Sequence, residues 1–182
     1  MTDPLFHVVL HEPEIPNNTG NIGRTCVAAG AALHLIHPLG FDLSEKACRR
    51  AGLDYWPRLD VREHESWDRY QDAENPSRVW LFSTGGCRSA FDADFRRGDH
   101  LVFGKETAGL PAEVLAGGDD RILAFPMVES ERSLNLATVV CAAVYEGLRQ
   151  LIARGEVSLS PTGRLPEYTK PGGGANPGHH AS

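Results

Sequence analysis

Short apolar runs alternate with helix-like segments along most of this chain, and this alternation constrains the fold more than any other sequence feature. Each run ends at glycine, proline or polar residues, as buried strands usually do. The runs are Phe6–Leu10, Leu33–Ile36, Val79–Phe82, Leu101–Phe103 and Ile122–Phe125. Their alternation with helices predicts an α/β fold, with a mostly parallel sheet flanked by helices.

Helices are predicted between these runs from capping residues and apolar spacing. Asn18-Thr19-Gly20 offers capping chemistry for a helix that ends at Gly30. Shorter helical segments are expected at 44–50, 66–73 and 111–115, and an ambiguous stretch holds a possible strand at 59–61. The last helix is the clearest, because apolar residues from Leu134 to Leu151 recur at intervals of three and four.

The length and composition fit a single domain, since 182 residues with 41% hydrophobic content are enough for a sizeable core. We expect this domain to span residues 1–156. Residues 157–182 are expected to form a disordered tail, because the Gly/Pro-rich segment from Pro171 onward has little to bury. No stretch approaches the roughly 20 apolar residues of a membrane span, and the first ten residues lack the layout of a secretion signal.

Charge and cysteine usage set weaker limits on partners and compartment. A net charge of −6 argues mildly against a nucleic-acid partner, although phosphate binding depends on where the cations lie. Basic residues cluster at Lys46, Arg49 and Arg50, and again at Arg88, Arg96 and Arg97. Such clusters are more often solvated surface than binding sites. The four cysteines show no metal-ligand or redox spacing, so a reduced, cytoplasmic compartment is expected.

Three segments that follow predicted strands carry the chemistry. The first, His11–Thr25, opens a helix at a strand end, where α/β proteins place ligands. Its asparagines and backbone N–H groups suit a phosphate or a ribose, and Arg24 lies one turn into the helix. The alternative interpretation is a capped turn with a surface arginine.

The second segment, Leu101–Pro111, has two glycines that let a backbone approach a ligand closely. It is not a phosphate loop, because Glu106 stands where that motif requires Ser or Thr. The third segment leads from Phe125 into the last helix through Ser133 and Asn135, either of which alternatively only caps the helix. Together the three segments predict a site for a nucleoside-like molecule that acts by positioning, without metal ligands or a nucleophile–base pair.

These segments closely resemble the three motifs of the SPOUT (α/β-knot) RNA methyltransferases. From about Phe6 to Arg154 the chain is similar to the subfamily that methylates the 2′-hydroxyl of the tRNA wobble nucleotide, the TrmL or YibK-like subfamily. The matching stretches are Glu12–Ile22, Arg50–Tyr55, Phe103-Gly104 with Glu106-Thr107, and Arg132–Leu136 leading to Val144-Tyr145-Glu146.

The resemblance implies a deep trefoil knot near the C-terminus, a feature that is very rare among folds. It further implies a cytoplasmic homodimer without a membrane partner, each site being completed across the subunit interface. S-adenosylmethionine would be the cofactor and S-adenosylhomocysteine its product, with no metal expected. The substrate would be the anticodon stem-loop of tRNA, in leucine isoacceptors. Another RNA such as rRNA, or a non-catalytic RNA-binding role of the same fold, stays open as an alternative.

The resemblance also assigns site residues. The expected cofactor contacts are Phe82, Ser83, Gly104, Gly109, Phe125, Met127, Ser133 and Leu134. The expected catalytic positions are Asn18, Arg24, Glu106, Asn135 and Tyr145. We expect Arg24 to contact the 2′-hydroxyl and to stabilise the developing oxyanion, because a free guanidinium is too basic to accept a proton. Lys105 and Ala108 depart from the family, where proline and arginine are frequent.

Overall fold

The computed structural model describes residues 3–42, 54–116, 118–168 and 170. Several sequence predictions lie outside these residues: the helix at 44–50, the basic cluster of Lys46, Arg49 and Arg50, most of the Arg50–Tyr55 motif, and the Gly/Pro-rich segment from Pro171.

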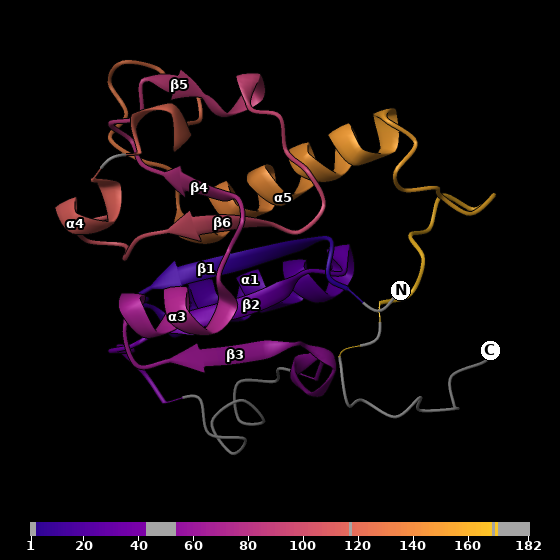
Figure 1. Ribbon diagram of the computed structural model, residues 1–182, viewed down its shortest axis with the longest axis horizontal. Coiled ribbons are helices and arrows are strands. Elements are labelled where there is room, and N and C mark those ends of the chain that lie inside the picture. The colour runs from indigo at the N-terminus through magenta and orange to yellow at the C-terminus, as the bar shows by residue number, and fades with distance from the viewer. Residues whose placement is uncertain (1–2, 43–53, 117, 169, 171–182) are drawn as a thin grey trace.

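Seven strands form one all-parallel sheet with the order β3-β2-β1-β6-β4-β7-β5 (Figure 1). The strands are β1 (Phe6–His11), β2 (Ala32–Ile36), β3 (Val61–His64), β4 (Val79–Phe82), β5 (Arg88–Ser89), β6 (Asp99–Phe103) and β7 (Ile122–Ala124). The predicted α/β class with a parallel sheet is confirmed. The two-residue strand β5 was not predicted from the sequence, and the predicted knot stays a prediction.

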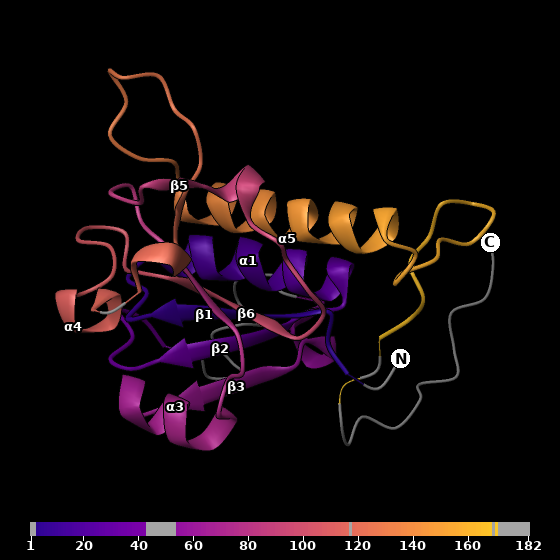
Figure 2. The ribbon, with the colours of Figure 1, turned by 45° about the horizontal axis from the view of Figure 1, so that its top comes forward.

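Helices cover both faces of this sheet (Figure 2). Helices α1 (Pro16–Ala29) and α5 (Leu136–Ala153) pack side by side on one face, and α3 (Trp67–Glu74) covers the other face near β2 and β3. The short helix α4 (Ala112–Leu115) follows β6, and three 3-10 turns occupy Trp56–Arg58, Ala90–Asp92 and Asp119–Arg121. Because strand side chains alternate, Phe6, Val8 and Leu10 join the core under α1 and α5, whereas Val9 packs with α3 on the opposite face.

The register of the central strands aligns the three segments that were predicted to carry chemistry. Leu10 pairs with Phe103, Phe103 with Phe82, and Phe82 with Leu123. The strands β1, β6, β4 and β7 therefore end at one edge of the sheet, where the loops that follow them converge. Ligands in parallel α/β sheets bind at such an edge.

Helix α1 begins earlier than the sequence suggested. It starts at Pro16, a residue whose fixed φ and missing N–H suit the first helical position, and no side chain caps it. The predicted capping role of Asn18-Thr19-Gly20 is therefore wrong, because Asn18 already lies within the first turn and its amide is used elsewhere. The predicted end is confirmed: Gly30 adopts the left-handed conformation and donates its N–H to Cys26.

Helix α5 is long and apolar enough to meet the length and composition test for a membrane span, with 18 residues and a mean hydropathy of 1.4. The sequence expectation that no stretch approaches this limit was therefore too strict. In the fold, Val140, Ala143, Val144 and Leu151 on this helix are buried in the main core. We interpret α5 as a core helix.

The described residues after Glu156 run back along the domain. Val157 is buried, Leu165 packs against the main core, and the Tyr168 hydroxyl donates a hydrogen bond to Asp60 at 2.8 Å. The boundary at residue 156 and the disorder of 157–182 stay predictions, but these contacts tie the part up to Tyr168 to the domain.

Candidate functional site

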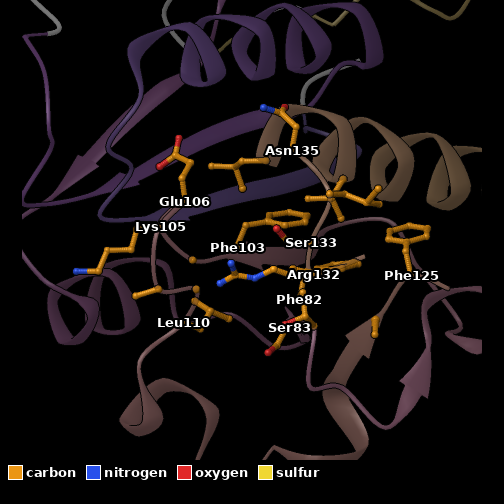
Figure 3. Close-up of a pocket in the computed structure, with 18 of the residues that line it drawn as sticks. Phe82, Ser83, Phe103, Lys105, Glu106, Leu110, Phe125, Arg132, Ser133 and Asn135 are labelled. Atoms are coloured by element: carbon orange, nitrogen blue, oxygen red, sulfur yellow. The ribbon is translucent and has the colours of Figure 1, made fainter. Parts of the chain in front are cut away.

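A cavity of about 630 Å³ lies at the edge of the sheet where β4, β6 and β7 end (Figure 3). Its walls are the loops after these strands, the segment that leads into α5, and the start of α1. The lining includes Ile15, Asn18, Phe82, Ser83, Thr84, residues 103–110, residues 123–125, Met127, residues 132–136 and Val139. All residues predicted to contact a cofactor lie in this lining, as do Asn18, Glu106 and Asn135. Arg24 and Tyr145 do not.

Phenylalanine rings form the apolar floor of the cavity. Phe82 stacks on Phe103 with ring centroids 4.5 Å apart and an interplanar angle of 13°, and its other neighbour in the cavity is Phe125 at 6.0 Å. Phe82 and Phe103 are buried because they end two adjacent strands of the central sheet. Stacked rings of this kind offer a flat surface that a planar heterocycle can pack against.

Glycine allows the loop after β6 to fold back on itself. A Cβ atom at Gly104 would lie 1.9 Å from the carbonyl carbon of Gly109 and 2.2 Å from the nitrogen of Leu110. The loop is closed by the Gly109 N–H, which donates to the Lys105 carbonyl at 2.8 Å, and Gly109 has a φ of 70°. Gly104 is thus required by contact within the chain itself, whereas the sequence had suggested only close approach of a ligand.

The carboxylate of Glu106 ties this loop to the start of α1. One oxygen accepts a hydrogen bond from the backbone N–H of Glu14 at 2.8 Å. The other accepts from the Asn18 amide at 2.9 Å and from the backbone N–H of Ile15 at 3.3 Å. Since both oxygens are engaged by donors of the chain, the geometry gives Glu106 a positioning role.

Asn135 continues the same network into α5. Its amide nitrogen donates to the Asn18 carbonyl oxygen at 3.0 Å, and its own carbonyl oxygen accepts from the backbone N–H groups of Ala137 and Thr138. The alternative that Asn135 caps the last helix is therefore confirmed. Through Asn18, this cap links the third segment to the first.

Charged groups fix the outer side of the loop after β6. Lys105 forms an ion pair with Glu12 at 2.8 Å, and this hydrogen bond raises the pKa of Lys105. Glu14 accepts hydrogen bonds from the backbone N–H and the hydroxyl of Thr107 at 3.1 and 3.0 Å. The departure at Lys105 thus places a cation beside the mouth of the cavity while the two acidic residues of the first segment hold the loop.

Sequence reasoning missed Arg132 as a candidate site residue. The residue lines the cavity, together with Ser133 and Leu110 (Figure 3). An arginine directly before a polar segment that opens a helix was the available signal, and it was used only to define the third motif. A guanidinium at this place suits a carboxylate or phosphate group.

Arg24 lies outside the cavity of its own chain. Its side chain is 63% exposed on α1, 3.7 Å from the Asp54 carboxylate, with the guanidinium 4.6 Å from the centre of the Tyr55 ring. An exposed ion pair of this kind is weak. These contacts therefore hold the guanidinium only loosely, and it stays exposed at the surface.

Tyr145 is also exposed, at 47%, and lies on α5. The large exposed apolar side chains of the described residues include Ile15 before α1 and Leu134 before α5, at 44% and 41%. Ile15 and Leu134 both line the cavity, whereas Tyr145 does not.

The second predicted basic cluster is not an open cationic patch. Arg96 pairs with Asp94 at 2.8 Å, Arg88 donates to the carbonyls of Asp92 and Asp120, and Arg97 donates to the carbonyl of Glu156. These arginines tie loops of the domain together, so the interpretation as ordinary surface charge is favoured for them.

The chain is similar in sequence to known RNA methyltransferases. The model of the SpoU rRNA methylase family matches residues 5–145. A tRNA (cytidine(34)-2′-O)-methyltransferase of Saccharophagus degradans is 47% identical over 148 residues, which cover 81% of this chain and 96% of that protein. The protein of the same name from Escherichia coli K12 is 44% identical over 154 residues, covering 84% and 98% of the two chains.

Solved structures agree with the sequence relatives. A chain from a study of the 2-OH methylation of C/U34 on tRNA superposes with a TM-score of 0.76 and 51% identity, covering 82% of this chain and 97% of that one. The SpoU methyltransferase AviRb of Streptomyces viridochromogenes, solved in complex with AdoMet, gives a TM-score of 0.69 and 26% identity, covering 84% and 60%. The chain therefore belongs to the SpoU methylase family, within the SPOUT methyltransferases.

Proposed function

We propose that this chain transfers a methyl group from S-adenosylmethionine to the ribose 2′-hydroxyl of nucleotide 34 in tRNA. The observation that carries the proposal is the near full-length similarity to proteins with this named activity, up to 47% identical, joined to a cavity built from the three motif segments. A positioning network and an aromatic floor suit a reaction in which alignment supplies most of the catalysis.

The residues of the cavity fit this cofactor. A volume of about 630 Å³ lies within the range of small-molecule sites. The stacked Phe82 and Phe103 rings suit the adenine, and the Gly104–Gly109 turn leaves main-chain groups at the wall where a side chain would block them. Ser83, Met127, Ser133 and Leu134 complete the proposed contacts. When bound, the cofactor supplies an activated methyl group on a sulfonium centre.

The residues of the chain then align the acceptor and assist loss of one proton. A ribose hydroxyl is a weak nucleophile at neutral pH, so stabilisation of the developing oxyanion lowers the barrier. We assign this electrostatic role to Arg24, which reaches the hydroxyl and the adjacent phosphate. Glu106, Asn18 and Asn135 hold the walls in register, because their hydrogen bonds join all three segments.

A homodimer would bring Arg24 to a cavity. Arg24 and Tyr145 lie outside the cavity of their own chain, and their exposed side chains stand on α1 and α5, two helices that pack side by side on one face of the sheet. We propose that α1 and α5 form the subunit interface and that Arg24 and Tyr145 face the acceptor nucleotide at the cavity of the partner. Light scattering on the purified chain tests this, with a monomer at working concentration as the contrary result.

The substrate is proposed to be the anticodon stem-loop of leucine tRNA isoacceptors in the cytoplasm. In the described residues Cys26, Cys87 and Cys141 are free thiols, as expected of a reducing compartment. We further propose that residues 1–156 form the catalytic domain, and we assign no role in methyl transfer to residues 157–182.

One assay separates this function from its alternative. Purified protein with labelled cofactor is given tRNA and rRNA separately, and the labelled RNA is digested and mapped by mass spectrometry. We expect one ribose methyl at nucleotide 34 of tRNA, and its loss in cells that lack the protein. Label in rRNA alone would favour the alternative that the family's description suggests. Label in neither RNA, with cofactor binding intact, would favour a non-catalytic RNA-binding role.

A further inference from the structure

Four histidines lie on four neighbouring strands, on the face of the sheet that α3 covers. They are His100 on β6, His7 on β1, His34 on β2 and His64 on β3. Of these, His34 is fully buried, and His100 and His64 are buried at 5% and 8% exposure. Most buried side chains of central strands are apolar, so this concentration of imidazoles calls for a physical account.

These side chains form a connected chain of contacts. His7 Nδ1 lies 2.9 Å from His34 Nε2, and His34 Nδ1 lies 3.0 Å from His64 Nε2. The carboxylate of Glu74, the last residue of α3, approaches the second junction: its Oε1 is 3.8 Å from His34 Nδ1 and 3.9 Å from His64 Nε2. Two imidazole nitrogens and one carboxylate oxygen therefore converge at one place.

We propose that His34, His64 and Glu74 form a binding site for a divalent transition-metal ion of the Zn²⁺ type. The three ligand atoms are separated by 3.0, 3.8 and 3.9 Å, so a point equidistant from them lies about 2.1 Å from each. This is the bond length of zinc to imidazole nitrogen and carboxylate oxygen. Two histidines and one carboxylate, with solvent completing the coordination, are a known ligand set for Zn²⁺ and Fe²⁺.

The other group of histidines suits a metal less well. His7 and His100 are stacked with ring centroids 4.2 Å apart and an interplanar angle of 3°. Because the lone pairs of an imidazole lie in the ring plane, two rings stacked this closely do not point at one ion. The rings of His34 and His64 are also near parallel, at 15°, but their centroids are 5.3 Å apart and their facing nitrogens are 3.0 Å apart. In addition, His100 Nδ1 is hydrogen-bonded to the Tyr70 hydroxyl at 2.6 Å. These two residues are neighbours of the proposed site and not its ligands.

Outer contacts orient each ligand in the way that metal sites require. His34 would bind the ion through Nδ1, and its Nε2 is hydrogen-bonded to His7, so coordination requires that His34 Nε2 carry the proton and donate it to His7 Nδ1. The second oxygen of Glu74 accepts a hydrogen bond from Arg62 at 2.8 Å.

The position of Glu74 supports a cation at this place. A carboxylate at the C-terminal end of a helix is unfavourable beside the negative end of the helix dipole. Arg62 compensates one oxygen, and the proposed ion would compensate the other. The side chains of Glu74 and His64 are 14% and 7% exposed, so the junction lies near the surface.

The proposed ion has no part in methyl transfer. None of its three ligands lines the cavity, and α3 covers the face of the sheet opposite to α1 and α5 (Figure 2). Its effect is to join the edge strand β3 and the end of α3 to β2. No metal was expected from the sequence, because the three strand-end segments hold no metal ligands and the family resemblance implies none.

Zinc titration of the full chain tests the proposal. The tail pair His179-His180 is first replaced by alanine, so that it does not contribute a second site, and the protein is stripped of metal. Titration of Zn²⁺ in competition with a chromophoric chelator should show one ion per chain, and added Zn²⁺ should raise the melting temperature. Glu74→Gln and His64→Gln should each weaken binding roughly tenfold or more, since each removes a ligand. His37→Gln, at an exposed histidine paired with Glu63, should leave it unchanged.

Cobalt distinguishes these ligands from the thiols. Co²⁺ bound to nitrogen and oxygen should give visible absorption without the near-ultraviolet charge-transfer band of a thiolate ligand, and Glu74→Gln should reduce it. Absence of a Zn²⁺-dependent rise in melting temperature in the tail variant would overturn the proposal. An unchanged affinity for Zn²⁺ in Glu74→Gln or His64→Gln would also overturn it, provided that the variant in question keeps the native circular dichroism spectrum.

Discussion

The cavity lies at the strand ends, and the four histidines at positions 7, 34, 64 and 100 form a second group beneath α3, here called the histidine corner. The two regions are built on the same sheet by opposite means. The cavity is made of loops whose shape depends on glycine and on side chains that bind backbone groups, as Glu106 does with Glu14 and Ile15. The corner is made of side chains on regular elements that bind one another, as His34 does with His7 and His64. Changes in the cavity should therefore act on ligand binding and turnover, and changes in the corner on stability.

The largest effect that this comparison predicts is that of Gly104→Ala. The added methyl would overlap the backbone of Gly109 and Leu110, and backbone atoms cannot rotate away as a side chain does. The loop after β6 must open, so we expect cofactor binding to fall below detection by calorimetry. The matched control is Gly85→Ala, where the nearest atom is the Ser83 hydroxyl at 3.9 Å and binding should persist. Normal binding by Gly104→Ala would contradict a cavity shaped by this turn.

Arg24→Ala should lower turnover about a hundredfold, the usual cost of removing one group that stabilises an oxyanion. Cofactor affinity should stay the same, because Arg24 does not line the cavity. Arg24→Lys should recover only part of the rate, since an ammonium lacks the planar fork of a guanidinium. Arg58→Ala, at an exposed arginine of the Trp56–Arg58 turn, is the control for loss of surface charge. Equal rates for the Arg24→Ala and Arg58→Ala variants would remove Arg24 from the mechanism.

Glu106→Gln should weaken cofactor binding roughly tenfold, as expected for loss of a hydrogen bond to a charged group. The amide keeps the shape of the carboxylate but replaces one oxygen with a donor, which then faces either the Glu14 N–H or the donors of Ile15 and Asn18. The first segment is therefore held less firmly to the loop after β6. Glu113→Gln on the exposed side of α4 is the control. An unchanged binding constant with tenfold lower turnover would instead give Glu106 a direct part in the chemistry.

The same contrast explains how far the sequence could be interpreted. The cavity was predictable because its residues form three local motifs after buried strands, and the parallel register then brings them to one edge. Arg24 and Tyr145 were predicted for the same site, but they lie outside the cavity of their own chain. Their proposed action across a subunit interface stays a prediction. Asn18 was misread as a cap, since Pro16 already provides the first helical residue.

The histidine corner was not predictable from local pattern. Positions 7, 34, 64 and 100 are separated by about thirty residues each, and only the pairing of four strands joins them. A histidine in a strand is ordinarily an isolated polar residue. None of these four therefore indicated a cluster until the order of the strands in the sheet was known. The edge strand β3 was itself ambiguous, because it holds Arg62, Glu63 and His64 where a buried strand would be apolar.

The smallest effect expected is that of Tyr70→Phe. This substitution tests the histidine corner and leaves every proposed metal ligand in the sequence. Tyr70 is fully buried, and its hydroxyl is hydrogen-bonded to His100. Removing the hydroxyl leaves a buried nitrogen without its partner, so the free energy of unfolding should fall by about 1 kcal/mol or more, while cofactor affinity and turnover stay the same. Tyr168→Phe removes a hydroxyl bonded to Asp60 at a half-exposed site, where water replaces the lost partner, and should cost less. Denaturant unfolding of both variants measures these two losses of stability, and calorimetry measures their cofactor affinity. If Tyr70→Phe lowers cofactor affinity as Glu106→Gln does, the two regions are coupled, and their division into a binding edge and a stabilising corner is wrong.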